Sequence, residues 1–540
     1  MSVIEQAQAW LAQDPDPVTR AELQDLLDAD DQEALADRFG QRLQFGTAGL
    51  RGALGAGPNR MNRVIVAQAA AGLAQYLLDH APDGTTPSVV VGYDARHNSD
   101  VFARDTAEIA EGLGVRAYLL PEALPTPVLA FAIRHLGASA GVMVTASHNP
   151  PQDNGYKVYL EDSSQIVPPA DSDISDAIDA VGPVDQLARG LDFEVLGPEV
   201  AEAYVQACVA LAQDGPRDVV AVYTPMHGVG RDTLVEVVRQ AGFPALHVVR
   251  EQGDPDPDFP TVVFPNPEEP GAMDLALKLA SEVGADIIVA NDPDADRCAV
   301  GVRDGESYRM LTGDQTGALL ADHMLRRGAT GTYAASIVSS DLLGRQAAAY
   351  GQPWQQTLTG FKWIGKIEDL AFGYEEALGY SVAPHIARDK DGVSAVLAAL
   401  ELAAELKAEG LTLLDRLDAV YREHGLHATG QLSVRVEDLS IIADAMATLR
   451  TTPPSSLGGL EVTSVDDLEL GYRGLPATDG IRLGLGEATR IIARPSGTEP
   501  KLKCYIEVVT PVTGSVDEAR AEATDQLERI KADLAAALGL

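Results

Sequence analysis

The stretch GVMVTASHNPPQDNGYKVY, residues 141–159, joins a short apolar run to a polar loop. The apolar run predicts a buried strand, and functional loops of α/β folds follow the carboxyl ends of such strands. A serine hydroxyl beside a histidine and near a lysine is a candidate activated nucleophile. The alternative is a proline-stopped turn whose Thr and Ser side chains cap a following helix. The polar residues of the loop include Thr145, Ser147, His148, Asn149 and Lys157.

Helix and strand patterns alternate on both sides of this stretch. Upstream, helices are expected over 64–80 and 100–114, and strands over 88–94 and 115–120. The alternation begins again near residue 200 and a third time at residue 312. Alternation of this kind predicts parallel sheets with helical crossovers.

The length of 540 residues requires several hydrophobic cores. The predicted fold class is α/β, with three similar α/β domains that contain mixed, mainly parallel sheets, followed by a C-terminal α+β domain of short strands and a closing helix. We expect domains at residues 1–200, 201–311, 312–428 and 429–540. The first begins with a helical lead-in over residues 1–40, whose candidate buried positions are Trp10, Leu11, Leu23, Leu26 and Leu27.

The net charge of −39, from 80 acidic and 41 basic residues, predicts a negative surface that repels nucleic acids and anionic membranes. A phosphate-binding enzyme of this composition must concentrate Arg and Lys in its site. Cys208, Cys298 and Cys504 lie far apart without a CxxC pair, which disfavours disulfides and structural zinc and fits a reducing cytoplasm. The N-terminal sequence lacks the pattern of a signal peptide, and no apolar run is long enough to span a membrane.

A second motif, NDPDADR at residues 291–297, places Asp292, Asp294 and Asp296 at alternate positions after an apolar strand. In extended chain, alternate side chains share one face, so the three carboxylates would converge and repel unless a cation lay among them. Oxygen ligands of this kind suit Mg²⁺. An EF-hand is excluded because Arg297 and Arg303 occupy the positions of its glycine and glutamate. A solvated acidic turn is the alternative.

Two further motifs suggest substrate contacts. The segment RPSGTEPKLK, residues 494–503, combines cations with small residues that let backbone N–H groups approach a phosphate, although such a turn is often only a turn. The segment GYEEALGY, residues 373–380, offers Glu375 and Glu376 as acceptors for sugar hydroxyls.

Together and in this order, the motifs resemble those of the α-D-phosphohexomutase family, which includes phosphoglucomutases and phosphomannomutases. TASHNP with NGYK resembles the family's phosphoserine loop, NDPDADR its metal loop and RPSGTEPK its phosphate-binding loop, while FGTAGLRG at residues 45–52 resembles its N-terminal active-site loop. The resemblance covers nearly the whole chain. It implies four domains around a central cleft, with the fourth acting as a phosphate-binding lid.

The resemblance also implies roles. Ser147 would carry the phosphoryl group and, with Asp292, Asp294 and Asp296, hold Mg²⁺. His148, Lys157 and Arg51 would assist catalysis, with Lys390 on the opposite side, and the sequence does not identify the general base. The implied substrate-binding residues are Thr359, Gly360, Lys362, Glu375, Glu376, Arg297, Arg494, Ser496, Gly497, Thr498 and Lys501.

The implied activity is phosphoglucomutase, which interconverts glucose 1-phosphate and glucose 6-phosphate with glucose 1,6-bisphosphate as intermediate and activator. Many family members have Glu-x-Ser in the sugar loop, whereas this chain has Ala377 at the serine position. This feature, the helical N-terminus and the length resemble the phosphoglucomutase-2-like branch. Phosphopentomutase, phosphomannomutase and sugar-bisphosphate synthase therefore stay open as alternatives.

Two other classes compete with a mutase. A haloacid-dehalogenase-type phosphatase would also have Asp-x-Asp after a strand, but it requires Thr or Val where Asp296 stands. A non-catalytic sugar-phosphate sensor is expected to have lost Ser147 or an aspartate, and this chain keeps them all. The sequence does not determine the oligomeric state.

Overall fold

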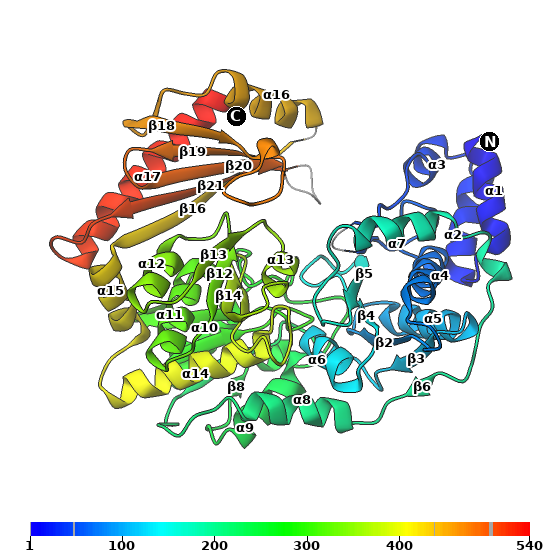
Figure 1. The fold of residues 1–540 in the computed structure, drawn as a ribbon, viewed down its shortest axis with the longest axis horizontal. Helices are drawn as coiled ribbons and strands as arrows, with labels where there is room; N and C mark the ends of the chain where they lie inside the picture. The colour runs from blue at the N-terminus through cyan, green and yellow to red at the C-terminus, as the bar shows by residue number, and fades with distance from the viewer. Residues whose placement is uncertain (1, 47–48, 437, 496–500, 540) are drawn as a thin grey trace. The chain divides into compact units, whose positions relative to one another are not determined.

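The computed structural model describes residues 2–46, 49–436, 438–495 and 501–539 (Figure 1). The chain forms two compact units, which are described separately. Unit 1 comprises residues 1–311, 365–368 and 377–409, and unit 2 comprises residues 312–364, 369–376 and 410–540. The described residues contain no helix that is long and apolar enough to cross a membrane.

Unit 1 begins with the predicted helical lead-in, namely α1 (Val3–Gln13), α2 (Pro17–Asp28) and α3 (Gln32–Phe39). Each helix starts where a Ser2, Asp16 or Asp31 side chain accepts a hydrogen bond from a backbone N–H of the first turn. Of the predicted core positions, Trp10 and Leu23 are buried, and Leu11, Leu26 and Leu27 are partly buried against the same core.

The first sheet has the strand order β1-β5-β4-β2-β3-β6. Strands β4, β2, β3 and β6 run parallel, while β5 is antiparallel to both β4 and β1. The strands are β1 (Leu50–Ala53), β2 (Ser88–Tyr93), β3 (Arg116–Leu119), β4 (Ala140–Val144), β5 (Asp153–Leu160) and β6 (Glu194–Val195). The helices and the 3-10 helix are α4 (Arg63–His80), α5 (Ser99–Gly112), α6 (Thr126–Leu136), α7 (Ala170–Asp179) and η1 (Val184–Gln186).

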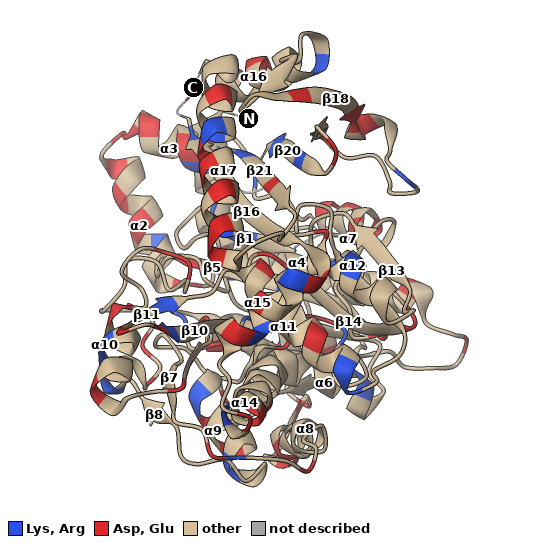
Figure 2. Ribbon diagram, turned by 90° about the vertical axis from the view of Figure 1, so that its left-hand side faces the viewer, with Lys and Arg blue, Asp and Glu red and all other residues tan. Residues whose placement is uncertain are grey.

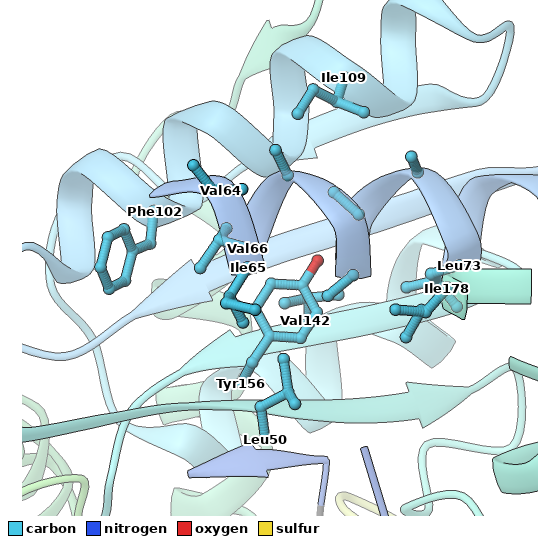
Figure 3. Packing of buried hydrophobic residues seen from close by; sticks show 14 of the residues in the cluster. Leu50, Val64, Ile65, Val66, Leu73, Phe102, Ile109, Val142, Tyr156 and Ile178 are labelled. Atoms are coloured by element: carbon cyan, nitrogen blue, oxygen red, sulfur yellow. The ribbon is translucent and has the colours of Figure 1, made fainter. Parts of the chain in front are cut away.

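The core of this sheet shows why the apolar patterns form these elements. Ile65 and Leu73 of α4 belong to one apolar cluster with Tyr156 of β5 and Ile178 of α7 (Figure 3). All four side chains are at least 96% buried. Burying an aliphatic side chain of this size stabilises the fold by about 1.5–3 kcal/mol. The packing fixes the strand ends from which the polar loops depart.

The second sheet of unit 1 has the order β11-β10-β9-β7-β8, with β9, β7 and β8 parallel and the β9-β10-β11 pairs antiparallel. Its strands are β7 (Ala221–Thr224), β8 (His247–Val248), β9 (Ile287–Ala290), β10 (Ala299–Asp304) and β11 (Ser307–Met310). The accompanying elements are α8 (Glu199–Val209), α9 (Gly230–Gln240), η2 (Arg250–Gln252) and α10 (Asp274–Val283), and unit 1 also includes β15 (Gly379–Ser381) and α14 (Gly392–Ala408).

Unit 2 contains a parallel arrangement in which β12 lies between β13 and β14. These strands are β12 (Thr332–Ser336), β13 (Trp354–Thr357) and β14 (Leu370–Glu375). The helices around them are α11 (Gly313–Arg326), α12 (Leu342–Ala349), α13 (Phe361–Gly365) and α15 (Leu413–His424).

The last sheet is antiparallel along β16-β21-β20-β19-β18-β17. Its strands are β16 (Leu426–Arg435), β17 (Ser456–Leu457), β18 (Leu460–Asp467), β19 (Ile481–Leu485), β20 (Thr489–Pro495) and β21 (Lys501–Thr510). It is accompanied by α16 (Leu439–Thr451), η3 (Leu468–Leu470) and α17 (Val516–Leu538). The predicted closing helix and the α+β character of this region are confirmed.

The predicted α/β class with mixed, mainly parallel sheets is confirmed for the first three regions. The domain boundaries and the central cleft stay predictions. The alternative in which Thr145 and Ser147 cap a following helix is excluded, because the strand β5 follows the loop. The sequence also gave no indication of α15, α16, β10, β11 or β19. Acidic residues recur along α2, α3 and α17 (red in Figure 2), in keeping with the predicted negative surface.

Asp314 of α11 allows a test of how burial affects stability. Burial raises the pKa of this carboxyl to about 6. Because the folded-state pKa lies above the unfolded one, its ionisation removes stability as the pH rises from about 4 to about 6. In the Asp314→Asn variant the amide oxygen still accepts from the Ser340 N–H and the Tyr374 hydroxyl, which lie 2.7 and 2.9 Å from the native carboxylate.

We expect Asp314→Asn to be more stable than the native protein at pH 8, by up to about 3 kcal/mol, and equally stable at pH 4. Unfolding midpoints measured at both pH values test this. Asp525→Asn, at an exposed position on α17, is the control and should change neither midpoint. Parallel pH profiles for native protein and Asp314→Asn would contradict the prediction.

Candidate active site

Ser147 lies in the loop that follows β4, with a backbone φ of 53°. Left-handed backbone is unfavourable for a residue with a Cβ atom and persists only where surrounding contacts hold it. The Ser147 N–H donates to Thr145 Oγ1 at 2.8 Å, and the Thr145 hydroxyl donates to Asp94 Oδ2 at 2.6 Å. All three residues are buried. The loop therefore presents the serine hydroxyl in one fixed position.

Arg96 binds the backbone carbonyls of this loop. The sequence-based prediction did not include this residue. Its guanidinium donates to the carbonyl oxygens of Ser147 at 2.7 Å, Pro150 at 2.8 Å and Asp153 at 3.1 Å, and also to that of Asn149. The side chain follows β2, which is the parallel neighbour of β4. The Asp-Ala-Arg run after the predicted strand 88–94 was the available signal, because adjacent parallel strands end at the same sheet edge.

The aspartates converge, but the predicted geometry of their loop was wrong. The chain is a turn rather than an extended segment: the Ala295 N–H donates to the Asp292 carbonyl at 2.9 Å, and Ala295 has a φ of 55°. The turn brings one oxygen from each of Asp292, Asp294 and Asp296 within 4.8 Å of the others, and all three residues are fully buried.

Several of the predicted catalytic residues meet these carboxylates. The Ser147 hydroxyl donates to Asp292 Oδ2 at 2.9 Å and lies 3.2 Å from His148 Nδ1. The Lys157 ammonium of β5 donates to Asp294 Oδ2 at 2.6 Å and to Asp296 Oδ2 at 2.8 Å. Lys390 Nζ lies 3.2 Å from Asp296 Oδ2. The candidate nucleophile, two lysines and the acidic triad therefore form one cluster within unit 1.

Burial and the neighbouring charges shift the pKa values of Asp292 and Asp296 in opposite directions. Burial and the neighbouring Asp294 and Asp296 charges raise the pKa of Asp292 well above its ordinary value. Burial would also raise the pKa of Asp296, but the Lys157, Lys390 and Arg297 charges lower it far below that value. A buried cluster with one poorly compensated carboxylate favours a further positive charge.

Two arginines and the histidine complete the group. Arg51 of β1 donates to Asn149 Oδ1 at 3.2 Å, and Arg297 Nε lies 3.8 Å from Asp292 Oδ2 and 4.0 Å from Asp296 Oδ1. Burial and the nearby Arg297 and Arg51 charges lower the pKa of His148 well below its ordinary value. The imidazole is therefore neutral at physiological pH. The concentration of cations expected for an acidic phosphate enzyme is present here.

The carboxylates fit a divalent cation. Asp294 Oδ1 and Asp296 Oδ1 are buried and have no hydrogen-bond partner among the described residues. Lys157 uses the other oxygen of each carboxylate, so these two atoms and the Asp292 carboxylate are the natural oxygen ligands for a hard cation such as Mg²⁺.

Two glycines allow other segments to pack closely against the acidic turn. A Cβ atom at Gly228 would lie 2.3 Å from Pro293 Cα, and the adjacent Val229 N–H donates to the Pro293 carbonyl at 2.9 Å. A Cβ atom at Gly392 would lie 2.2 Å from the Arg297 carbonyl oxygen and 2.7 Å from that of Ala295. The backbone of the turn is thus clamped by the loop after β7 and by the start of α14.

The predicted sugar-binding residues belong to unit 2. Glu375 Oε1 accepts from the Gly360 N–H at 2.7 Å, so these two predicted residues are adjacent. Glu376 Oε2 accepts from the hydroxyls of Ser336 at 3.2 Å and Ser339 at 2.8 Å. Thr359 lies in the same short turn as Gly360, and Lys362 Nζ lies 5.8 Å from the centre of the Trp363 ring.

The predicted phosphate loop connects β20 to β21. Ser496, Gly497 and Thr498 lie outside the described residues. Arg494 near the end of β20 and Lys501 at the start of β21 are both half-buried. Arg494 stands opposite Lys503 in the strand register, a third cation that the sequence reasoning did not include. Like charges opposite one another are unfavourable unless an anion offsets them, which suits a phosphate site.

Comparison with known proteins identifies the family of the chain. The chain matches the family models described as phosphoglucomutase/phosphomannomutase, with alpha/beta/alpha domain I at residues 42–184, domain II at 202–305, domain III at 312–423 and the C-terminal domain at 434–537. The chain belongs to this phosphohexomutase family. It is therefore a mutase, an isomerase that transfers a phosphoryl group within its substrate.

Named relatives of this phosphohexomutase differ in their sugar. A "Probable phosphomannomutase" of Haemophilus influenzae is 48% identical, over 87% of this chain and 97% of that protein. A phosphoribomutase of Saccharomyces cerevisiae is 38% identical over 92% and 91% of the two chains. A phosphoglucomutase of Staphylococcus haemolyticus is 36% identical over 87% and 91%. The relatives therefore identify the reaction class but not the sugar.

A solved structure shares the fold. The phosphoglucomutase pp63/parafusin from Paramecium, in its open form, has a TM-score of 0.69 with 21% identity and covers 92% of this chain and 96% of its own.

The close packing at Gly392 generates a prediction. In Gly392→Ala, the added methyl group displaces the Arg297 and Ala295 carbonyls, which should destabilise the fold by about 1–3 kcal/mol and weaken binding of Mg²⁺ by the acidic turn. Thermal unfolding and titration calorimetry with Mg²⁺ test both effects. Gly182→Ala, where nothing lies within 4 Å of the new Cβ, is the control. Equal Mg²⁺ affinity in the two variants would contradict the prediction.

Proposed function

We propose that the protein is a phosphoglucomutase that acts through a phosphoserine at Ser147 and requires Mg²⁺. The observation that carries this proposal is the 2.9 Å hydrogen bond from the Ser147 hydroxyl to Asp292, within a buried acidic triad of a chain that belongs to the phosphohexomutase family. A hydroxyl that is held in one position beside a candidate cation site suits phosphoryl transfer.

In the first step, the C6 hydroxyl of glucose 1-phosphate attacks the phosphorus of phosphorylated Ser147. The bond between phosphorus and Ser147 Oγ breaks and Ser147 Oγ takes a proton, while the C6 hydroxyl proton passes to a base and glucose 1,6-bisphosphate forms. In the second step, the reoriented bisphosphate presents its C1 phosphate, which Ser147 Oγ attacks. The bond between phosphorus and the C1 oxygen breaks, that oxygen takes a proton, and glucose 6-phosphate leaves with the phosphoserine restored. Added bisphosphate therefore acts as an activator, because it phosphorylates Ser147.

Residues of unit 1 support these steps. His148 Nδ1, 3.2 Å from Ser147 Oγ, is placed to take the serine proton, while Arg51, Lys157 and Lys390 supply positive charge near the transferred group. Asp292, Asp294 and Asp296, with the phosphoserine, would hold Mg²⁺, which neutralises charge on the transferred phosphoryl group.

Residues of unit 2 are proposed to recognise the substrate. Glu375 and Glu376 accept hydrogen bonds from sugar hydroxyls, with Thr359, Gly360 and Lys362 beside them. The loop from Arg494 to Lys501, which includes Ser496, Gly497 and Thr498, binds the phosphate that does not react, while Arg297 of unit 1 also contacts substrate. The three cysteines are buried and free, which suits a reducing cytoplasm as the place of action.

A pentose phosphate is the second candidate substrate. A "Probable phosphoribomutase" of Schizosaccharomyces pombe aligns with 97% of this chain, and Ala377 departs from the Glu-x-Ser pattern of many hexose enzymes.

Replacement of the nucleophile tests the mechanism. Ser147→Ala removes the atom that accepts the phosphoryl group, so we expect at least about a thousandfold loss of mutase activity, and no phosphopeptide containing residue 147 in mass spectra after incubation with glucose 1,6-bisphosphate. Ser281→Ala, at an exposed serine of α10, should retain full activity. Undiminished turnover by Ser147→Ala would refute the phosphoserine mechanism.

The sugar is tested by comparing kcat/KM for glucose, mannose and ribose 1-phosphates, with Mg²⁺ and a trace of glucose 1,6-bisphosphate. We expect glucose 1-phosphate to give the highest value. A preference for ribose 1-phosphate would replace the glucose proposal with a phosphopentomutase, and a preference for mannose 1-phosphate would replace it with a phosphomannomutase. Bisphosphate accumulation without isomerisation would instead identify a sugar-bisphosphate synthase.

A further inference from the structure

The segment of residues 336–341, SIVSSD, which we name the serine turn, holds Glu376 of unit 2. Ser339 contacts Glu376 twice, because its hydroxyl donates to Glu376 Oε2 at 2.8 Å and accepts from the Glu376 N–H at 3.0 Å. Ser336 adds a third hydrogen bond at 3.2 Å. The orientation of the Glu376 carboxylate therefore depends on where the serine turn lies.

A buried ion pair from the last sheet fixes the serine turn. Arg490 of β20 and Glu507 of β21 are opposite one another in register, and Arg490 Nε donates to Glu507 Oε2 at 2.7 Å. The same guanidinium donates to the Ile337 carbonyl at 2.6 Å and to the Ser339 carbonyl. Arg490 is only 4% exposed, and so is Glu507.

Glu507 also binds the far end of the serine turn. Its Oε1 accepts from the Ser340 hydroxyl at 2.6 Å and from the Asp341 N–H at 2.9 Å, and it lies 2.8 Å from His427 Nδ1. Arg490 and Glu507 together therefore hold both ends of a turn whose middle carries Ser339. Apolar packing of Ile337 and Val338 with Ile492 completes the contact.

An ion pair this deeply buried is a poor source of net stability, because the desolvation of both charges offsets their attraction. The pair does have a positional effect. Side chains alternate along a strand, so Arg490, Ile492 and Arg494 share one face of β20. That face contacts the serine turn at Arg490 and carries a predicted phosphate-binding cation at Arg494.

We propose that Arg490, oriented by Glu507, is a positioning residue that sets the sugar-binding geometry of Glu376 through Ser339, and so links the strands that flank the phosphate loop to sugar recognition. This inference rests on the proposed role of Glu376 in binding the sugar. Arg490 itself does not touch the substrate.

Arg490→Lys tests the link, because it keeps the charge but removes the planar fork that reaches two carbonyls and the carboxylates of Glu507 and Asp341. We expect about a tenfold rise in KM for the sugar phosphate, the effect of one charge-assisted hydrogen bond, with kcat changed less than about threefold. The control is Arg416→Lys, which breaks a similar fork on Asp322 between α15 and α11. It should leave KM unchanged.

A double-mutant cycle separates positioning from general destabilisation. Ser339→Ala alone should raise KM by a similar factor, and the Arg490→Lys/Ser339→Ala double variant should raise it little further, because both changes break one chain of contacts. The inference would be overturned if the KM increases of the two single variants multiplied in the double variant. An unchanged KM in Arg490→Lys, or an equal rise of KM in Arg416→Lys, would also overturn it.

Phosphorylation of Ser147 by glucose 1,6-bisphosphate, followed by mass spectrometry in every variant, distinguishes the two levels of proposal. A native enzyme that is never phosphorylated refutes the proposed function. A phosphorylated, active native enzyme with an unchanged KM in Arg490→Lys refutes only the positioning role.

Discussion

Three fully buried carboxylates within 4.8 Å of one another are the constraint on which unit 1 depends. Their mutual repulsion must be balanced, and the Lys157 ammonium does so by contacting Asp294 and Asp296 at once. Because Lys157 belongs to β5, which pairs with β4, the ion pairs also connect the first sheet of unit 1 to the turn after β9 in its second sheet. The same ion pairs therefore balance the buried carboxylates and hold the two sheets of unit 1 together.

This balance requires an exact backbone. Arg96 gathers the carbonyls of the serine loop, and the glycines at positions 228 and 392 let neighbouring segments approach the acidic turn to distances that a Cβ would prevent. None of these three residues contacts the carboxylates directly in the hydrogen bonds described above. Their effect is to fix where the side chains of the candidate site begin, so that Ser147 meets Asp292 without further reorganisation.

Because the chain is strongly acidic, its clustered cations are needed to attract an anionic substrate. In a chain with a net charge of −39, an anionic sugar phosphate is repelled from most of the surface. Arg51, Lys157, Arg297 and Lys390 all belong to the group around the triad and the serine loop. In unit 2, Arg494 of β20 and Lys503 of the adjacent strand β21 are opposite one another in register. Positive charge is therefore concentrated around the candidate site residues, and the low dielectric of a buried site increases its effect.

The sequence by itself determined the fold class and the order of the motifs, and it singled out the candidate nucleophile and the acidic residues, because apolar periodicity and short local motifs are properties of neighbouring residues. It predicted that Asp292, Asp294 and Asp296 converge, although it assumed an extended chain where Ala295 makes a left-handed turn. Only the tertiary structure decided that Lys157 pairs with two of the aspartates, that Arg96 holds the serine loop and that Arg490 reaches the serine turn. Those contacts join residues from 51 to 153 positions apart, and only the packing of sheets and helices brings such residues together.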